Sequence, residues 1–240
     1  MRRGRAGAGR PGTRLWGDAA GVAAIEFAAA LPVLLVVMAV GLQVALYVNA
    51  KRSVERLART ISQMISQAVP PAGAATATVN AADIRFGFDA AIVLFPYVLA
   101  DAARQGIPWQ SNIAINAAGI AFTKVASGCS DPTDQSACYV ANVVWTSSGT
   151  GGASYRPCLV AQQPAGNAAP PSPTTLPRSV FGPASLVVVD VVFTFRPTFG
   201  ATYVPSARIA HSVYVQPRYA ALVSYDPTNT DGIAETCPGY

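Results

Sequence analysis

The chain of 240 residues is 51% hydrophobic and carries a formal net charge of +5 at pH 7. That length accommodates one membrane anchor and one globular domain of ordinary size, and it excludes a large multidomain enzyme. Five of the seventeen basic residues lie within the first twenty positions, so the chain from Val22 onward is nearly neutral. A neutral domain lacks the electrostatic footprint of a nucleic-acid-binding protein, and we expect no nucleic-acid partner.

The first segment, residues 1–21, is rich in Gly, Ala and Arg and has no apolar periodicity. This composition is typical of a disordered tail rather than of a folded element. We therefore expect a basic cytoplasmic leader.

Phe27 to Val48 is a run of 22 residues without a charge, and Glu26 stands at its head. As a helix the run would be about 33 Å long, against a hydrocarbon core of about 30 Å, so it predicts one membrane crossing. A carboxylate at bilayer depth costs on the order of several kcal/mol, which makes Glu26 a functional candidate. Pro32, about one turn into the run, is expected to kink the helix or to free a carbonyl, and this suggests partners within the membrane.

Basic residues flank the run on both sides, and the positive-inside rule favours a cytoplasmic N-terminus by a margin of one. The cysteines all follow the run, are even in number and contain no CxxC pair; they are Cys129, Cys138, Cys158 and Cys237. This usage indicates disulfides in an oxidising compartment. We expect a single-pass membrane protein whose C-terminal domain lies outside the cytoplasm and is periplasmic or extracellular.

Beyond the run, apolar residues from Val54 to Ala68 recur at three- and four-residue spacing, which predicts that the helix continues as a stalk. Pro70 and Pro71 end this element, so the transmembrane and stalk helix is expected over 22–69. A linker over 70–82 then leads to an extracytoplasmic domain over 83–240. Its first elements are a helix from about Ala81 to Phe95 and a shorter continuation to Arg104.

The rest of the domain predicts an antiparallel sheet. Ser185–Phe195 alternates between an apolar face and a partly wet face that carries Asp190. Arg208–Gln216 alternates likewise, and Asn112–Val125 predicts one more strand or a broken pair. The fold class expected is therefore α+β, with the long helix and a second helix packed on an antiparallel sheet.

Tyr139–Thr146 and Ala153–Val160, joined by a Ser/Gly turn, predict a hairpin. If this hairpin turns near Ser148, Cys138 lies opposite Cys158, and Cys129 and Cys237 would tie the C-terminal tail to the sheet. Four cysteines allow three connectivities, and the sequence leaves the choice open. Residues 162–177 are proline-rich and predict a long loop.

The segment Gly21-Val22-Ala23-Ala24-Ile25-Glu26-Phe27, followed by the apolar run interrupted at Pro32, resembles the N-terminus of TadE-like proteins, the minor pseudopilins of the Flp (Tad, tight adherence) pilus system. The resemblance covers roughly Gly21 to Ile61. A weaker similarity to late elements of such chains comprises Phe195–Phe199 and the strand ending Val215-Gln216-Pro217-Arg218.

The resemblance implies a pilin-like fold and removal of the leader between Gly21 and Val22 by a prepilin peptidase. It also implies that Glu26, next to Phe27, neutralises the new amine of a neighbouring subunit. The partners implied are the inner membrane, the peptidase, other pilins and pseudopilins, and the Tad secretion machinery. The expected role is initiation, priming or capping of the pilus, and the sequence does not separate the TadE from the TadF type.

Plainer interpretations stay open. Glu26 could mark the edge of an ordinary signal anchor, in an unprocessed envelope protein with a binding or structural role. A conventional signal peptidase could instead cut near Ala28 to Ala30.

The sequence contains no nucleophile elbow, HExxH or Walker loop, and four cysteines with one histidine lack zinc spacing. His211 shares a strand face with Ile209 and Val213, which favours a core or edge histidine over a catalytic base. We expect no enzyme activity, no metal site and no cofactor.

Overall fold

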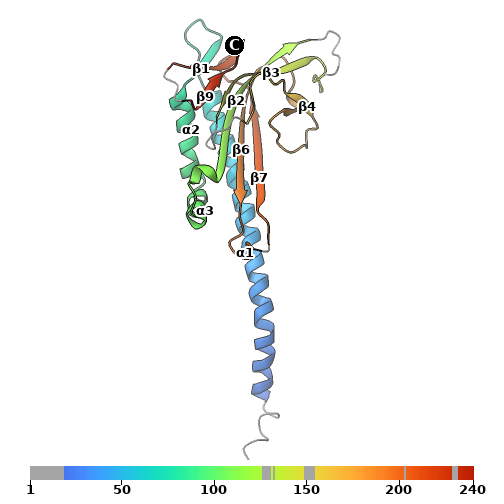
Figure 1. Cartoon of the computed structure of the whole chain (residues 1–240). Coiled ribbons are helices and arrows are strands. Elements are labelled where there is room, and N and C mark those ends of the chain that lie inside the picture. Colours follow the sequence, from blue (N-terminus) through green and yellow to red (C-terminus); the bar gives the residue numbers. More distant parts are fainter. Residues whose placement is uncertain (1–18, 126–130, 132, 149–154, 203, 229–231) are drawn as a thin grey trace, which may run out of the picture. The chain divides into compact units, whose positions relative to one another are not determined.

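The computed structural model describes residues 19–125, 131, 133–148, 155–202, 204–228 and 232–240. The chain divides into two units, Met1–Leu46 and Tyr47–Tyr240. The first unit contributes helix α1 up to Leu46, and the second contains the rest of α1 and every strand that the structure describes (Figure 1).

Helix α1 extends from Ala19 to Ser66 as one element with Pro32 inside it. The continuous helix expected over 22–69 is thus present, although it ends three residues earlier. The N–H groups of Gln67 and Ala68 bond to the carbonyls of Met64 and Ile65, three residues back, so the last turn tightens before Pro70.

The second half of α1 buries one face in the second unit, as its periodicity predicts. The buried residues on this face are Ala50, Val54, Leu57, Ala58, Ile61 and Ile65. Helix α2 approaches closely at Gly87, where a Cβ would lie 3.3 Å from Ile61 Cγ2. An alanine at position 87 would therefore require the Ile61 side chain to shift by a few tenths of an ångström.

Two short helices follow, close to the predicted bounds. Helix α2 (Ala81–Leu94) begins with a capping box in which Asn80 and Asp83 satisfy each other's backbone N–H groups. Helix α3 (Tyr97–Gln105) starts after Pro96 and ends at Gly106, whose φ of 67° is the left-handed conformation that glycine adopts readily. The 3-10 turn η1 (Trp109–Ser111) then leads into the sheet.

The main sheet is antiparallel and has the order β7-β6-β2-β3-β9. Its strands are β2 (Ile113–Lys124), β3 (Tyr139–Ser147), β6 (Leu186–Phe195), β7 (Ala207–Val215) and β9 (Ala234–Thr236). The α+β prediction is confirmed, and β2 is one strand with a register shift between Gly119 and Ile120.

Two small parallel pairs were not expected. Strand β1 (Thr76–Val79) pairs with β8 (Leu222–Tyr225), so the predicted linker over 70–82 contains a strand. Strand β4 (Gln163–Ala165) pairs with β5 (Thr175–Pro177), and the turn η2 (Arg178–Val180) follows. The prediction of a loop without elements over 162–177 was therefore wrong.

The predicted hairpin was also wrong. Strand β3 does not turn back near Ser148 to pair with the segment that follows; it pairs with β9, and the N–H of Ser148 bonds to the carbonyl of Ile233 at 2.7 Å. The described part of the expected second strand, residues 155–160, is irregular. The chain returns to β3 only at Gln162, which forms an isolated bridge with Ala141.

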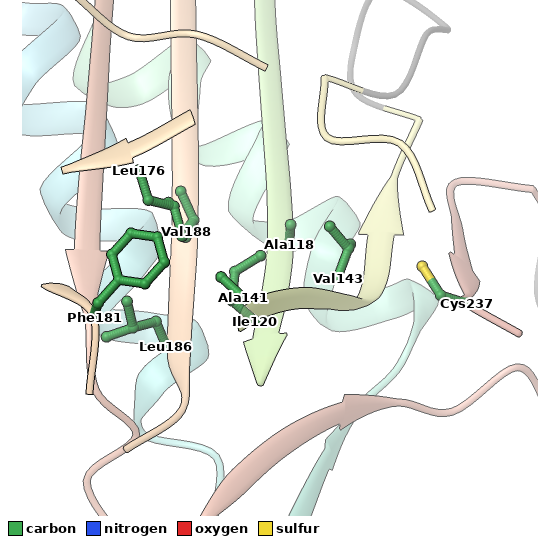
Figure 2. Packing of buried hydrophobic residues seen from close by; sticks show 9 residues of the cluster. All are labelled: Ala118, Ile120, Ala141, Val143, Leu176, Phe181, Leu186, Val188 and Cys237. Atoms are coloured by element: carbon green, nitrogen blue, oxygen red, sulfur yellow. The ribbon is translucent and has the colours of Figure 1, made fainter. Parts of the chain in front are cut away.

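Both faces of the central strands are covered. Figure 2 shows the cluster on one face, made of Ala118, Ile120, Ala141, Val143, Leu176, Phe181, Leu186, Val188 and Cys237. Leu176 of β5 and Phe181 after η2 lie over β6 there, so the face of β6 predicted to be partly wet is closed. On the opposite face, Phe193 packs edge-on against Phe95 with ring centroids 5.0 Å apart.

Candidate functional site

The predicted processing junction lies in the first turn of α1. The Gly21–Val22 bond follows two residues after the helix begins at Ala19, within the turn whose N–H groups have no helical partner. The Val22 side chain is 54% exposed. Val22 and Glu26 are four residues apart, and such residues are neighbours on a helix surface.

Glu26 is the only charged residue between Ala19 and Leu46. Its side chain is exposed in the structure, and the neighbouring Phe27 is 66% exposed. No cation within that stretch can neutralise the carboxylate. If Glu26 lies within lipid, a compensating positive charge would come from the chain's own N-terminal region or from a partner.

The apolar run after Glu26 is exposed along its length. Large hydrophobic side chains from Val22 to Val44 are between 38% and 72% exposed. An apolar surface of this extent is unstable in water and marks a membrane or interaction surface. Of the described helices, α1 is long and apolar enough to cross a membrane, near the N-terminus. The bent pair α2 and α3 passes the same test of length and composition, but these helices bury side chains in the second unit.

Helix α1 passes through Pro32 without interruption. Because proline has no N–H, the carbonyl of Ala28 receives no hydrogen bond from residue 32. The predicted role of Pro32 as a marker of neighbouring groups in the membrane stays a prediction, as do the roles of Gly21, Val22, Glu26 and Phe27.

The cysteines pair differently from the arrangement that the hairpin suggested. Cys158 is bonded to Cys237, with Cα atoms 5.2 Å apart. The reason is the sheet order: β3 lies beside β9, so the segment that follows β3 meets the C-terminal tail instead of the beginning of β3. Cys138 is also disulfide-bonded, and Cys129 lies outside the described residues.

A buried ion pair lies in the middle of the sheet, where sequence reasoning had placed a partly wet face. Arg156 donates from Nε to Asp190 Oδ2 at 2.8 Å and from Nη2 to Oδ1 at 3.0 Å, and the two side chains are 1% and 2% exposed. Nη1 bonds to Gln162 Oε1 at 2.5 Å and to the carbonyl of Thr175 at 3.0 Å. Ser212 donates its hydroxyl to Asp190.

Protein groups accept hydrogen bonds from four of the five N–H donors of Arg156, which indicates a structural role. Burial disfavours the cation, but the Asp190 carboxylate outweighs burial and raises the pKa of Arg156. The signal that sequence reasoning missed was Asp190 itself, an acid between two valines of a long apolar strand. An acid in such a place is retained in a core only when a partner neutralises it.

A second network holds the end of β6, where the weaker resemblance lies. Arg104 pairs with the buried Asp101 and donates to the carbonyls of Arg196 at 2.9 Å and Pro197 at 3.2 Å. Asp101 also accepts from Gln105 and from Asn112. The start of the β6–β7 loop is thus fixed by α3.

His211 lies on the edge strand β7. Burial lowers the pKa of its imidazole, although Glu55 of α1 opposes the shift. Glu55 itself pairs with Arg59 at 2.7 Å, and the hydrogen bond from Arg59 lowers the pKa of that carboxyl. Within the part of the chain that the structure describes, no group of three His, Cys, Asp or Glu side chains could hold a metal ion.

The comparison with protein families identifies the N-terminal part of the chain. Residues 21–62 match the family model described as TadE-like protein. The match begins at the predicted junction and includes Glu26, the apolar run and most of the packed half of α1. No curated protein and no solved structure matches the chain. The resemblance stated from Gly21 to Ile61 is therefore confirmed.

Proposed function

Since residues 21–62 are those of a TadE-like protein, we propose that this membrane-anchored chain supports the assembly of a Flp (Tad) adherence pilus as a minor pseudopilin. It would initiate, prime or cap the pilus. The observation that carries the proposal is the head of α1, where one carboxylate precedes an exposed apolar helix within the family match. We also propose that the chain acts by packing and is not an enzyme.

Cleavage between Gly21 and Val22 would create an amine with which the Glu26 carboxylate can pair. The new ammonium of Val22 would lie about one helical turn from the carboxylate. When helices of two subunits pack side by side in lipid, the carboxylate of one can neutralise the amine of the other, and two costly charges become one pair. The side of Gly41 is open, because a Cβ there would meet no atom within 4 Å, and small residues of this kind allow helices to approach closely.

The same proposal assigns an orientation. The chain would cross the inner membrane once, with the leader in the cytoplasm and the disulfide-containing unit outside it. The bond between Cys158 and Cys237 supports this direction because structural disulfides persist in oxidising compartments. Its partners would be the prepilin peptidase, other pilins and pseudopilins, and the Tad secretion machinery.

The first test is the mass of the mature N-terminus. The protein is isolated from native membranes of cells with and without the prepilin peptidase, and its N-terminal peptide is sequenced. We expect a chain beginning at Val22 only when the peptidase is present. An intact Met1, or a cut near Ala30 that does not depend on the peptidase, would contradict the pseudopilin proposal.

The second test is Glu26→Ala. We expect normal membrane insertion but at least about a tenfold loss of assembled pili, because an uncompensated amine in lipid costs more than about 1.4 kcal/mol. Asp89→Ala, which removes an exposed carboxylate from α2, is the matched control and should leave piliation unchanged. Equal piliation by both variants would rule out charge pairing at Glu26.

The other candidate is an unprocessed, signal-anchored envelope protein with a binding or structural role. It is favoured by one observation: α1 already begins at Ala19, so the helix does not require cleavage at Val22. The N-terminal mass separates the two candidates directly.

A further inference from the structure

The β6–β7 loop leaves the sheet beside the first turns of the part of α1 that belongs to the second unit (Figure 1). Phe195, the last residue of β6, packs edge-on against Tyr47 of α1 with ring centroids 5.5 Å apart. Tyr47 is the last but one residue of the uncharged run Phe27–Val48. At the opposite end of the sheet, the N–H of Arg218 bonds to the carbonyl of Ser66 at 2.9 Å. The second half of α1 therefore follows the sheet from the β6–β7 loop to the end of β7.

This loop has the composition of a membrane interface. The loop covers residues 196–206 and contains no acidic residue. Phe199 is 52% exposed and Val204 is 50% exposed. Exposed aromatic and aliphatic side chains next to basic ones are typical of segments that lie in the headgroup layer.

Basic side chains border the same end of the unit. Lys51 and Arg52 are exposed on α1, and Arg196 is exposed at the start of the loop. Lys51 is three residues beyond Val48, about 4.5 Å further along the helix. The headgroup layer on each side of the hydrocarbon core is about 5–7 Å thick, so the Lys51 side chain would reach it. Helical side chains also lean toward the N-terminus, which here means toward the apolar run.

Helix α3 holds the base of the loop in place. Arg104 bonds to the carbonyls of Arg196 and Pro197 and is itself paired with the buried Asp101. Phe199 lies close to this fixed base, because Arg196 and Pro197 are bonded to α3. An anchored base lowers the entropy that docking on a surface would otherwise lose.

We propose that Phe199, Val204, Arg196, Lys51 and Arg52 form an interfacial surface that docks on the bilayer crossed by α1. Phe199 and Val204 enter the boundary between headgroups and acyl chains, and the three basic residues pair with anionic phosphate headgroups. This docking sets the depth of the second unit at the membrane. The inference rests on the proposed membrane crossing of α1 and adds a second, independent contact with the same lipid.

The test places tryptophan at single positions in the full-length chain, reconstituted in vesicles of phosphatidylglycerol and acyl-brominated phosphatidylcholine. Bromine quenches tryptophan within the bilayer, and the signal of the three native tryptophans is subtracted using the parent protein. We expect Phe199→Trp and Leu34→Trp to be quenched. Tyr219→Trp, at the other end of the sheet and 61% exposed in the parent, should not be quenched.

The controls separate the two proposals. Quenching at position 34 but not at 199 would overturn the interfacial surface while the membrane anchor stands. The same pattern with position 199 also shielded from aqueous iodide would show that a second copy of the chain covers the loop. Quenching at neither position would remove the anchor, and the interfacial surface with it.

The basic residues are tested with the pair Lys51→Gln and Arg52→Gln in the Phe199→Trp background. We expect the extra quenching in phosphatidylglycerol vesicles, relative to vesicles of brominated phosphatidylcholine alone, to fall toward zero. Arg218→Gln, a charge removed near the far end of the sheet, should preserve the difference. Equal quenching in both vesicle types for the parent background would overturn the role of the basic residues.

Discussion

Asp190 lies between Val189 and Val191 in the middle of β6. Its carboxylate accepts hydrogen bonds from Nε and Nη2 of Arg156. Arg156 belongs to an irregular segment, so its side chain fastens that segment to the sheet. Neither residue is accessible to solvent. The pair therefore stabilises the arrangement only while both partners are present, since either alone would be a buried, uncompensated charge.

We predict that Asp190→Ala destabilises the protein by about 3–5 kcal/mol, because Arg156 is left buried without its counter-ion. The free energy of unfolding is measured by chemical denaturation of the detergent-solubilised chain. Arg178→Ala is the matched control: it breaks the exposed pair with Asp134 and should change stability by less than about 1 kcal/mol. Similar losses for the two variants would show that the pair is not isolated from water.

The replacement of both partners gives a sharper test. Arg156→Met combined with Asp190→Leu should be less destabilising than Asp190→Ala alone, because no charge is left in the interior. A double variant as unstable as the single one would assign the effect to packing.

His211 makes stability depend on pH. Burial lowers the pKa of the folded imidazole below its usual 6.5, so the unfolded chain binds a proton more readily than the folded one. The stability associated with the neutral imidazole is complete above about pH 6.5, and it is lost as the pH falls below that value. The charged groups facing His211 are Glu55, Arg59 and Lys51.

We predict a lower free energy of unfolding at pH 5.5 than at pH 7.5, measured by denaturation at both values. His211→Gln should flatten this dependence, because the chain contains no other histidine. If the variant keeps the parent's pH dependence, carboxylates and not His211 cause the loss of stability at low pH.

At the scale of elements, the sequence predicted those with strong local patterns. The helical periodicity of α1 and α2 and the alternation of β6 and β7 extend over enough residues to be recognised. Strands β1, β8 and β9 have only three or four residues each, too few for a periodic signal. Each of these strands pairs with a strand that is distant in sequence, so no turn between the two predicts the pairing.

The candidate site divides in the same way. The head of α1 could be predicted because Glu26, the apolar run and Pro32 are consecutive features of the chain. The Arg156–Asp190 pair could not, because it joins positions that only the sheet order brings together. The Ser/Gly segment after β3 did not reveal that the neighbour of β3 would be β9.

The disulfide between Cys158 and Cys237 encloses a segment with a sequence separation of 79 residues. We predict that Cys158→Ser with Cys237→Ser lowers the free energy of unfolding by about 4 kcal/mol, since closing such a long loop removes much entropy from the unfolded chain. Denaturation under non-reducing conditions measures the loss. A parent-like stability of the double variant would show that the C-terminal tail is held by its strand contacts alone.

At the scale of the whole molecule, the two units differ in the exposure of their apolar residues. The first unit exposes its apolar residues, and the second contains the buried core. The packed half of α1 belongs to the second unit, where its buried face completes that core. The membrane segment should therefore be separable from the fold.

We predict that a chain of residues Tyr47–Tyr240 folds without detergent. Its melting temperature should be about 2–4 °C below that of the full chain, the shift expected for a loss of about 1 kcal/mol when the new helix end frays. Differential scanning calorimetry and gel filtration measure folding and aggregation. The control is the full-length chain in buffer alone, which should aggregate. A truncated chain that also aggregates would contradict the separation of the units.

The parallel pairing of β1 with β8 bears on the order of events during biosynthesis. Residues 76–79 leave the ribosome well before their partners, residues 222–225. A nascent chain therefore cannot complete its second unit until residues 222–225 have been translated, long after its apolar segment is ready to enter the membrane. Membrane insertion should accordingly precede folding. For that interval, the unfinished domain would depend on the cell's chaperones for protection.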